Sequence, residues 1–166
     1  MLPDRASSRL AALFAGAVLL GTAPLPLLAA DDPPPPASKA AAASPLTTAR
    51  EHIAAKRWAA AVTELQRVNA KADADWNNLM GYALRKQATP DLAGAEAHYN
   101  EALRLNPKHL GALEYSGELY LMKGEPAGAE ERLATLAKAC SNCEEYRDLK
   151  GATERYKAAG NRYLPP

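Results

Sequence analysis

The residues best suited to chemistry are two cysteines, Cys140 and Cys143, near the C-terminal end of the chain. Cysteines at this spacing form a disulfide, bind zinc or act as a thioredoxin-like redox pair. They flank a predicted turn between two helices, where residues three apart can reach bridging distance. A zinc site needs two more ligands, and a thioredoxin-like pair needs a preceding strand, which is not predicted. The sequence therefore favours a disulfide, with zinc binding and a redox role as alternatives.

Three histidines, His52, His98 and His109, are the other candidates for catalysis or metal binding. They fall in different predicted helices, and no Ser or Cys nucleophile accompanies them in a recognisable catalytic motif. His98 and His109 are predicted to lie a repeat away from the cysteines. The sequence also has no glycine-rich loop for phosphate. We expect no enzymatic activity, no cofactor and no metal.

The N-terminus has the pattern of an export signal. Arg5 and Arg9 precede an apolar run over residues 10–20, which is followed by small residues and prolines. This run is shorter than the roughly 20 residues that span a bilayer, which favours a signal peptide over a permanent membrane anchor. We assign residues 1–30 to a cleaved signal peptide and expect the chain in the periplasm. That oxidising compartment also favours a disulfide.

The segment after the signal, residues 31–45, is rich in proline and alanine and includes four consecutive prolines. It has little apolar surface to bury, so we predict a disordered linker, largely extended. A docking ligand for a proline-binding domain is the alternative. Without residues 1–30 the chain has 18 basic and 18 acidic side chains. This balance disfavours nucleic acid and membrane surfaces as partners.

The remaining residues fit one helical domain. The hydrophobic share of 48% is mostly Ala and Leu, with a single Phe, which favours closely packed helices over a sheet. Small or apolar residues recur every 34 positions, and within each repeat they are spaced four and then three apart, on one helical face. The three sets are Ala61, Ala95 and Ala129; Leu65, Tyr99 and Leu133; and Val68, Ala102 and Leu136.

This periodicity, with its Gly and Pro interruptions, predicts six helices in three hairpins over residues 46–142. A seventh helix, assigned to residues 143–160, is interpreted as a cap that covers the last repeat. The turn at residues 87–91 has two more residues than its counterpart in the next repeat. The predicted helices lie near residues 47–56, 58–70, 75–87, 92–105, 109–122, 126–139 and 143–159.

These repeats resemble the tetratricopeptide-repeat family. The resemblance implies an all-α fold, a right-handed superhelical stack of about three hairpins plus a capping helix. The segment from Cys143 to Leu149 also resembles the ending of small exported proteobacterial members. The last repeat carries Leu113, Ser116, Gly117, Tyr120, Gly124, Ala129 and Leu133, the middle one Met80, Gly81, Ala95, Tyr99 and Pro107, and the first only Ala61, Leu65 and Val68.

The resemblance implies a non-catalytic scaffold that binds a protein or peptide on the surface formed by the first helix of each pair. Tyr82 and Arg85 rank first, because Tyr and Arg most often anchor interfaces; a merely solvated helix face is the alternative. A self-associating envelope component and a thiol-dependent accessory protein are the other functions considered. The family's binding positions project onto Arg50, Asn78, Tyr82, Arg85, Glu114, Glu118 and Met122.

Overall fold

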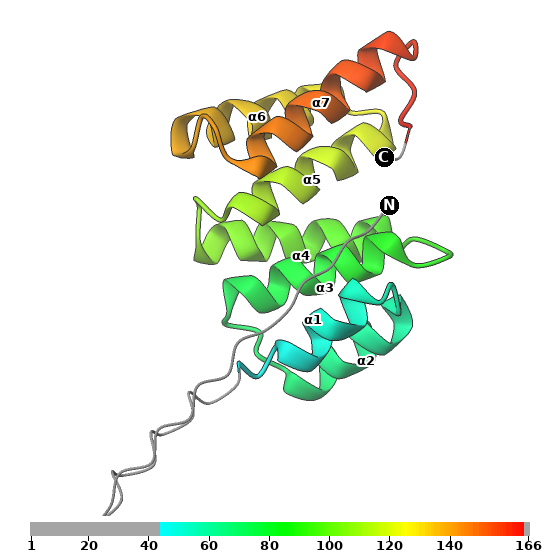
Figure 1. Cartoon of the computed structure of the whole chain (residues 1–166), viewed down its shortest axis with the longest axis vertical. Helices are drawn as coiled ribbons and strands as arrows, with labels where there is room; N and C mark the ends of the chain where they lie inside the picture. Colours follow the sequence, from blue (N-terminus) through cyan, green and yellow to red (C-terminus); the bar gives the residue numbers. More distant parts are fainter. Residues whose placement is uncertain (1–43, 165–166) are drawn as a thin grey trace, which may run out of the picture. The chain divides into compact units, whose positions relative to one another are not determined.

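The computed structural model describes residues 44–164, which form seven α-helices. Figure 1 shows them stacked in chain order, each lying beside the next. The predicted signal peptide and all but the end of the predicted linker lie outside these residues. No helix of residues 44–164 is long and apolar enough to span a bilayer. The helices are α1 (Thr47–Ala54), α2 (Trp58–Val68), α3 (Ala74–Lys86), α4 (Leu92–Leu105), α5 (Leu110–Lys123), α6 (Pro126–Ala139) and α7 (Glu144–Ala158).

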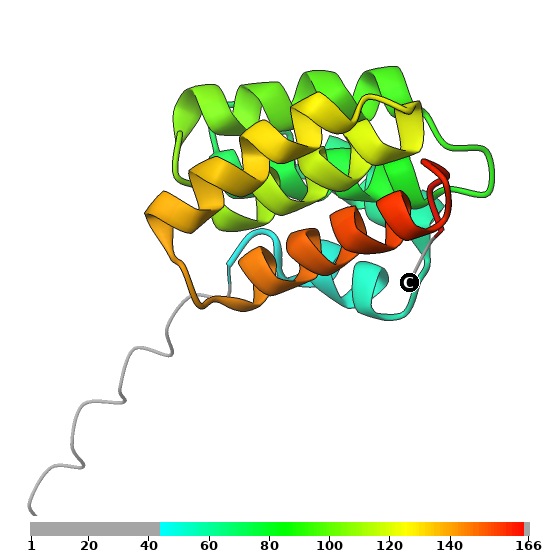
Figure 2. The same ribbon diagram turned by 90° about the horizontal axis from the view of Figure 1, so that it is seen from above.

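The helices form two layers. Each helix packs against its successor, and the odd-numbered helices also contact one another, α1 with α3, α3 with α5 and α5 with α7. In the described part of the chain the even-numbered helices make no such contacts among themselves. We therefore call α1, α3, α5 and α7 the inner layer, and α2, α4 and α6 the outer layer. Figure 2 shows α6 and α7 side by side at the end of the stack nearest the viewer.

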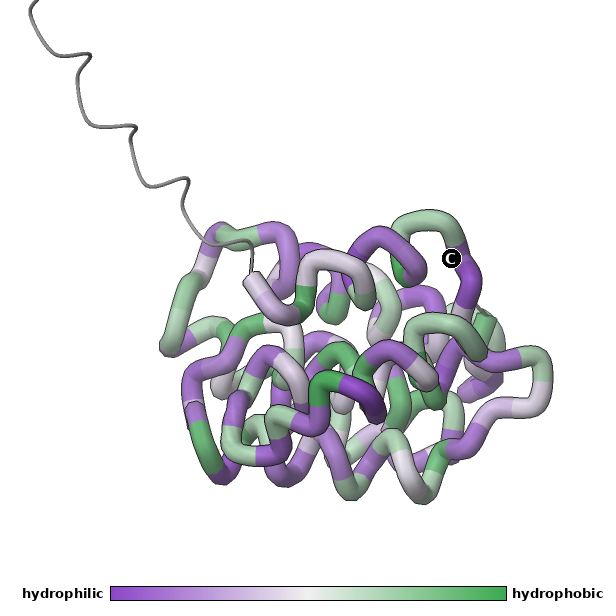
Figure 3. The backbone as a smooth tube through the Cα atoms, turned by 90° about the horizontal axis from the view of Figure 1, so that it is seen from below, coloured by the Kyte–Doolittle hydropathy of each residue, from purple (hydrophilic) through white to green (hydrophobic). Residues whose placement is uncertain are grey.

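The 34-residue period marks the buried face of the outer helices, as predicted. Ala61, Ala95 and Ala129 are completely buried, one in each outer helix. Leu65 and Tyr99, which share the second periodic position, are also completely buried. Figure 3 shows the corresponding alternation of hydrophilic and hydrophobic positions along the helices. The predicted all-α stack of helical hairpins is confirmed.

Two glycines explain how closely the helices approach. A Cβ atom on Gly81 would lie 2.8 Å from Cε1 of Tyr99 and 3.0 Å from the carbonyl oxygen of Ala95. A Cβ atom on Gly117 would lie 2.5 Å from Cδ2 of Leu149 in α7. The helices therefore approach closely at both positions, which leaves no room for a side chain there. At Gly117, however, the atoms that a side chain would displace belong to the Leu149 side chain, and not to a neighbouring backbone.

Local signals fix where the helices begin and end. The carboxylates of Asp73 and Asp91 accept hydrogen bonds from the amides of Trp76 and Gly94, which caps α3 and α4. The longer connection predicted at residues 87–91 forms a loop beyond the end of α3 (Figure 1). Gly124 ends α5 in the left-handed conformation, with φ of 76°.

Helix α7 packs on both α5 and α6. It buries Leu149, Ala152 and Tyr156, while Tyr146 is only partly buried. After α7 the chain reverses at Gly160 and Asn161, both with positive φ. This reversal brings Tyr163 onto the cluster that contains Tyr156.

Candidate functional site

The strongest candidate site is a pocket of about 370 Å³ on the inner layer, which we call the inner pocket. Three consecutive inner helices contribute to it, and their side chains are mostly charged or aromatic. Helix α3 supplies Tyr82, Arg85 and Lys86, α5 supplies Glu114, Tyr115 and Glu118, and α7 supplies Arg147, Asp148 and Arg155. A spacing of three or four residues in α3 and α5, and of seven or eight in α7, places these side chains on one face of each helix.

A buried ion pair lies at the base of the inner pocket. Nη1 of Arg85 lies 2.7 Å from Oε2 of Glu118, and the two side chains are 1% and 8% exposed. This pair joins α3 to α5. Removing either partner would leave the other charge buried and unpaired, which costs about 3–5 kcal/mol in comparable buried pairs.

Aromatic rings surround the Arg85 guanidinium. Its central carbon lies 5.6 Å from the ring centre of Tyr82 and 5.7 Å from that of Tyr115, within the range of cation–π attraction. The two tyrosine rings lie 4.5 Å apart, and Trp58 of α2 meets Tyr82 edge-on at 5.8 Å. Burial raises the pKa of Tyr82, so its hydroxyl stays protonated at neutral pH.

Glu114 is the exceptional group in the inner pocket. Its side chain is only 8% exposed, yet it forms no hydrogen bond or ion pair with any residue in the 44–164 range. Burial raises the pKa of Glu114 from its ordinary 4.5 to about 8, and the carboxylates of Glu118, Asp148 and Glu145 act in the same direction. Arg85, which pairs with Glu118, acts against this shift. Glu114 is therefore mostly protonated at pH 7.

Helix α7 supplies a charged rim that the sequence did not reveal. Arg147, Asp148 and Arg155 are exposed and line the inner pocket from the side opposite α3. Nη1 of Arg147 donates a hydrogen bond of 2.8 Å to the carbonyl oxygen of Asn142, which holds this side chain in place. Besides covering the last hairpin, α7 thus shapes the site.

The structure gathers four of the seven predicted binding residues, Tyr82, Arg85, Glu114 and Glu118, in the inner pocket. Because Arg85, Glu114 and Glu118 are buried, they are not the solvated helix face considered as an alternative. Sequence reasoning also missed Lys86 and Tyr115, which are neighbours in sequence of Arg85 and Glu114. Side-chain type could have indicated Tyr115, since Tyr is enriched at interfaces.

The other three predicted residues do not line the inner pocket. Asn78 is 7% exposed, and its amide nitrogen lies against Gly111 at the start of α5. The sulfur of Met122 lies 3.8 Å from Nη1 of Arg85, beside the buried ion pair. Arg50 is half exposed on α1 and pairs with Asp75. These residues support the layer and do not form the pocket.

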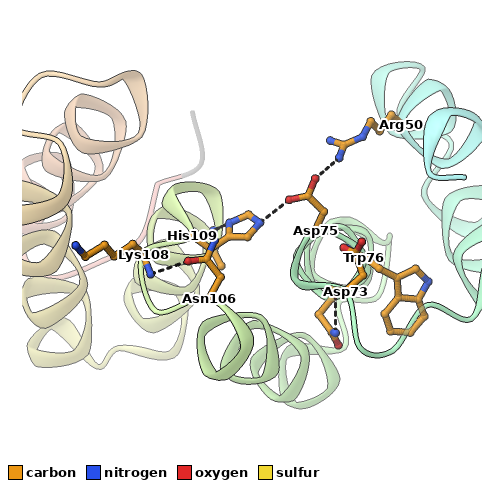
Figure 4. Close-up of polar contacts among 9 residues, drawn as sticks. Arg50, Asp73, Asp75, Trp76, Asn106, Lys108 and His109 are labelled. Atoms are coloured by element: carbon orange, nitrogen blue, oxygen red, sulfur yellow. Dashed lines mark hydrogen bonds and ion pairs between the residues drawn. The ribbon is translucent and has the colours of Figure 1, made fainter. Parts of the chain in front are cut away.

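Arg50 belongs to a polar chain that joins three inner helices (Figure 4). Its Nη2 lies 2.7 Å from Oδ2 of Asp75 in α3, and Oδ1 of Asp75 lies 2.9 Å from Nε2 of His109. Nδ1 of His109 accepts the amide hydrogen of Ala112, which caps α5. Because Nδ1 is the acceptor, Nε2 carries the proton and donates to Asp75. His109 thus links α3 to the start of α5, and Nδ1 of His98 lies 3.0 Å from Oδ1 of Asn77.

The two cysteines form a disulfide, as predicted. Cys140 follows the last residue of α6 and Cys143 precedes the first residue of α7, with their Cα atoms 5.7 Å apart. In the described part of the chain, the group of potential metal ligands close enough to share one ion is Cys140, Cys143 and Glu145. The disulfide leaves no thiolate in that group, so it does not supply the sulfur ligands that zinc requires.

The layered hairpins and the pocket on their inner face define an all-α helical-repeat protein. A family model described as tetratricopeptide repeat matches residues 89–153, which run from the turn before α4 into α7. Over these residues the chain is similar to tetratricopeptide repeats. Repeats of this family generally mediate protein–protein interactions and are typically non-catalytic. No curated protein matches the chain.

Proposed function

We propose that this chain is a non-catalytic interaction scaffold of the periplasm that binds a peptide or helix of another protein in the inner pocket. One observation carries the proposal. Three consecutive inner helices direct charged and tyrosine side chains into one pocket of about 370 Å³. Tyrosine and arginine are the residue types that most often anchor protein interfaces. The family's general role in protein–protein interaction supports the same conclusion.

The periplasmic location rests on two independent features. Arg5 and Arg9 followed by the apolar run of residues 10–20 have the pattern of an export signal. The disulfide between Cys140 and Cys143 is of a kind that persists in oxidising compartments and is rare in the cytosol. Fractionation of the cells that produce the chain, with the intact mass of the recovered protein, tests both the compartment and the cleavage of residues 1–30.

Self-association as an envelope component has less support. Within residues 44–164, Leu164 is the large hydrophobic side chain that is exposed, at 49%. Stable oligomer interfaces usually need a larger contiguous apolar area than a single leucine provides. The polar inner pocket is better suited to a partner with charges of its own.

The test is a crosslinking pull-down from periplasmic extract with charge-reversed rim residues, Arg147→Glu and Arg155→Glu together. Both residues are exposed, so the fold should survive, whereas Arg85→Ala would leave Glu118 buried without its partner. The matched control is Arg67→Glu with Arg104→Glu on the outer helices, where the side chains are 71% and 68% exposed. Loss of one partner from the rim variant alone supports the proposal. Equal capture by both variants would show that the inner pocket is not the binding surface.

A further inference from the structure

We propose that the inner pocket recognises a lysine or arginine side chain of the partner, which inserts toward Glu114, and that acidic residues beside it contact the rim. This inference rests on the proposed function and specifies the chemistry of its ligand. The observation behind it is a buried carboxyl group that faces a pocket without any protein partner.

The contrast between Glu114 and Glu118 is the first step. The two residues are one turn apart on α5 and are equally buried, at 8% and 6% exposure. Glu118 has Arg85 as its counter-ion at 2.7 Å, whereas no cation of the described chain pairs with Glu114. Buried carboxylates in proteins are normally paired, because an isolated buried charge is costly. Glu114 thus has the environment of one half of an ion pair whose other half comes from outside.

The surroundings of Glu114 favour a cation over an anion. After burial, the carboxylates of Glu118 on its own helix and of Asp148 and Glu145 on α7 raise the pKa of Glu114, whereas Arg85 of α3 lowers it. Arg85 is already neutralised by Glu118. Three carboxylates thus oppose the ionisation of Glu114, and the proton that it holds at pH 7 occupies the place of a cationic group.

A side-chain ammonium or guanidinium fits this place better than a metal ion. In the described part of the chain, Glu114, Glu118 and Asp148 do not form a group whose oxygens are close enough to share one ion. Tyr115, which lines the same pocket, offers a ring that attracts organic cations. The volume of about 370 Å³ is within the range of pockets that take a small organic group.

The charged side chains at the opening of the inner pocket determine which residues are favoured beside the basic residue of the partner. Lys86, Arg147 and Arg155 surround the opening, against a single acidic rim residue, Asp148. Charge complementarity therefore favours a partner segment with Asp or Glu on either side of its Lys or Arg. A uniformly basic segment would be repelled at the rim before its side chain reached Glu114.

The test begins with a phage library of random peptides selected on the exported chain with its disulfide formed. We expect enrichment of peptides with a Lys or Arg flanked by Asp or Glu, lost when the Arg147→Glu, Arg155→Glu variant is the bait. Calorimetry then follows the best peptide. Glu114→Gln, or norleucine in place of the peptide's basic residue, should each weaken binding about tenfold or more, because each removes one partner of a buried charged hydrogen bond.

Binding should also release about one proton at pH 7, because ionisation of Glu114 accompanies entry of the cation. Calorimetry in two buffers of different ionisation enthalpy measures this number. Unchanged affinity in Glu114→Gln would overturn the inference. Enriched peptides that lack a basic residue would overturn it too, while leaving the scaffold function intact. If no peptide is enriched on the wild-type chain, the proposed peptide binding itself fails.

Discussion

Replacing Glu114 by Gln should stabilise the free protein at neutral pH, although it alters a buried residue. In the folded chain the pKa of Glu114 is raised from 4.5 to about 8. Between these values the folded state holds a proton that the unfolded chain has lost. The free energy of unfolding therefore falls by about 1.36 kcal/mol for each pH unit in this window. Gln does not titrate and avoids this loss.

The magnitude follows from the width of the window. Below pH 4.5 the carboxyl is protonated in both states, so Gln and Glu should be nearly equivalent. At pH 7 the advantage of Gln reaches about 3 kcal/mol, and above pH 8 it levels off at about 5 kcal/mol as an upper limit. Urea unfolding at pH 5, 7 and 9, followed by circular dichroism, measures these differences.

Glu118→Gln is the matched control, with the same substitution one helical turn away. It removes the counter-ion of Arg85, so we expect a loss of about 3–5 kcal/mol at pH 7. The two substitutions should thus act in opposite directions. A stability difference for Glu114→Gln that does not change between pH 5 and 9 would refute the proposed burial of an unpaired carboxyl.

Three further predictions concern the scaffold, and urea unfolding measures each of them. Gly81→Ala should lower the free energy of unfolding by about 1–3 kcal/mol, because the new Cβ meets the buried ring of Tyr99. The control Gly151→Ala, where the nearest neighbour is the flexible end of Arg155, should be neutral or stabilising. Equal effects of the two substitutions would contradict this account. The double variant Cys140→Ser, Cys143→Ser lacks the disulfide and should lose about 2 kcal/mol of stability, since the disulfide closes a very short loop. A loss above twice this value would mean that the disulfide stabilises more than the α6–α7 turn. His109→Ala should cost about 1 kcal/mol through loss of the α5 cap. Asp75→Ala should cost less, because both side chains of its ion pair with Arg50 are exposed; a larger cost for Asp75→Ala would contradict this ranking.

Periodic burial made the fold predictable from the sequence. Positions such as Ala61, Ala95 and Ala129 require a small residue because paired helices cross there, and this requirement produces a regular period in the sequence. The disulfide was predictable as well, because Cys140 and Cys143 are three positions apart at a predicted helix-to-helix turn, and the expected export signal favours an oxidising compartment. Both features depend on local spacing, which a sequence shows directly.

The pocket was only partly predictable because it depends on contacts between helices. Family positions selected Tyr82 and Glu114, which line the inner pocket, but nothing in the sequence shows that Glu114 lacks a counter-ion while Glu118 has one. Arg147 and Arg155 were assigned to a cap because α7 has the polar surface of a terminal helix. Its packing on α5, which turns these arginines to the rim, becomes visible only in three dimensions.

The polar chain of Arg50, Asp75 and His109 has a mechanical consequence. It joins α1 to the first turn of α3 and to the start of α5, whereas the pocket residues of α3, Tyr82, Arg85 and Lys86, lie at the other end of that helix. The first three inner helices are therefore connected to one another at this end of α3. The buried Arg85–Glu118 pair joins α3 to α5 again at the inner pocket. These two helices are therefore connected at two separate points, and we expect them to move together as one rigid unit.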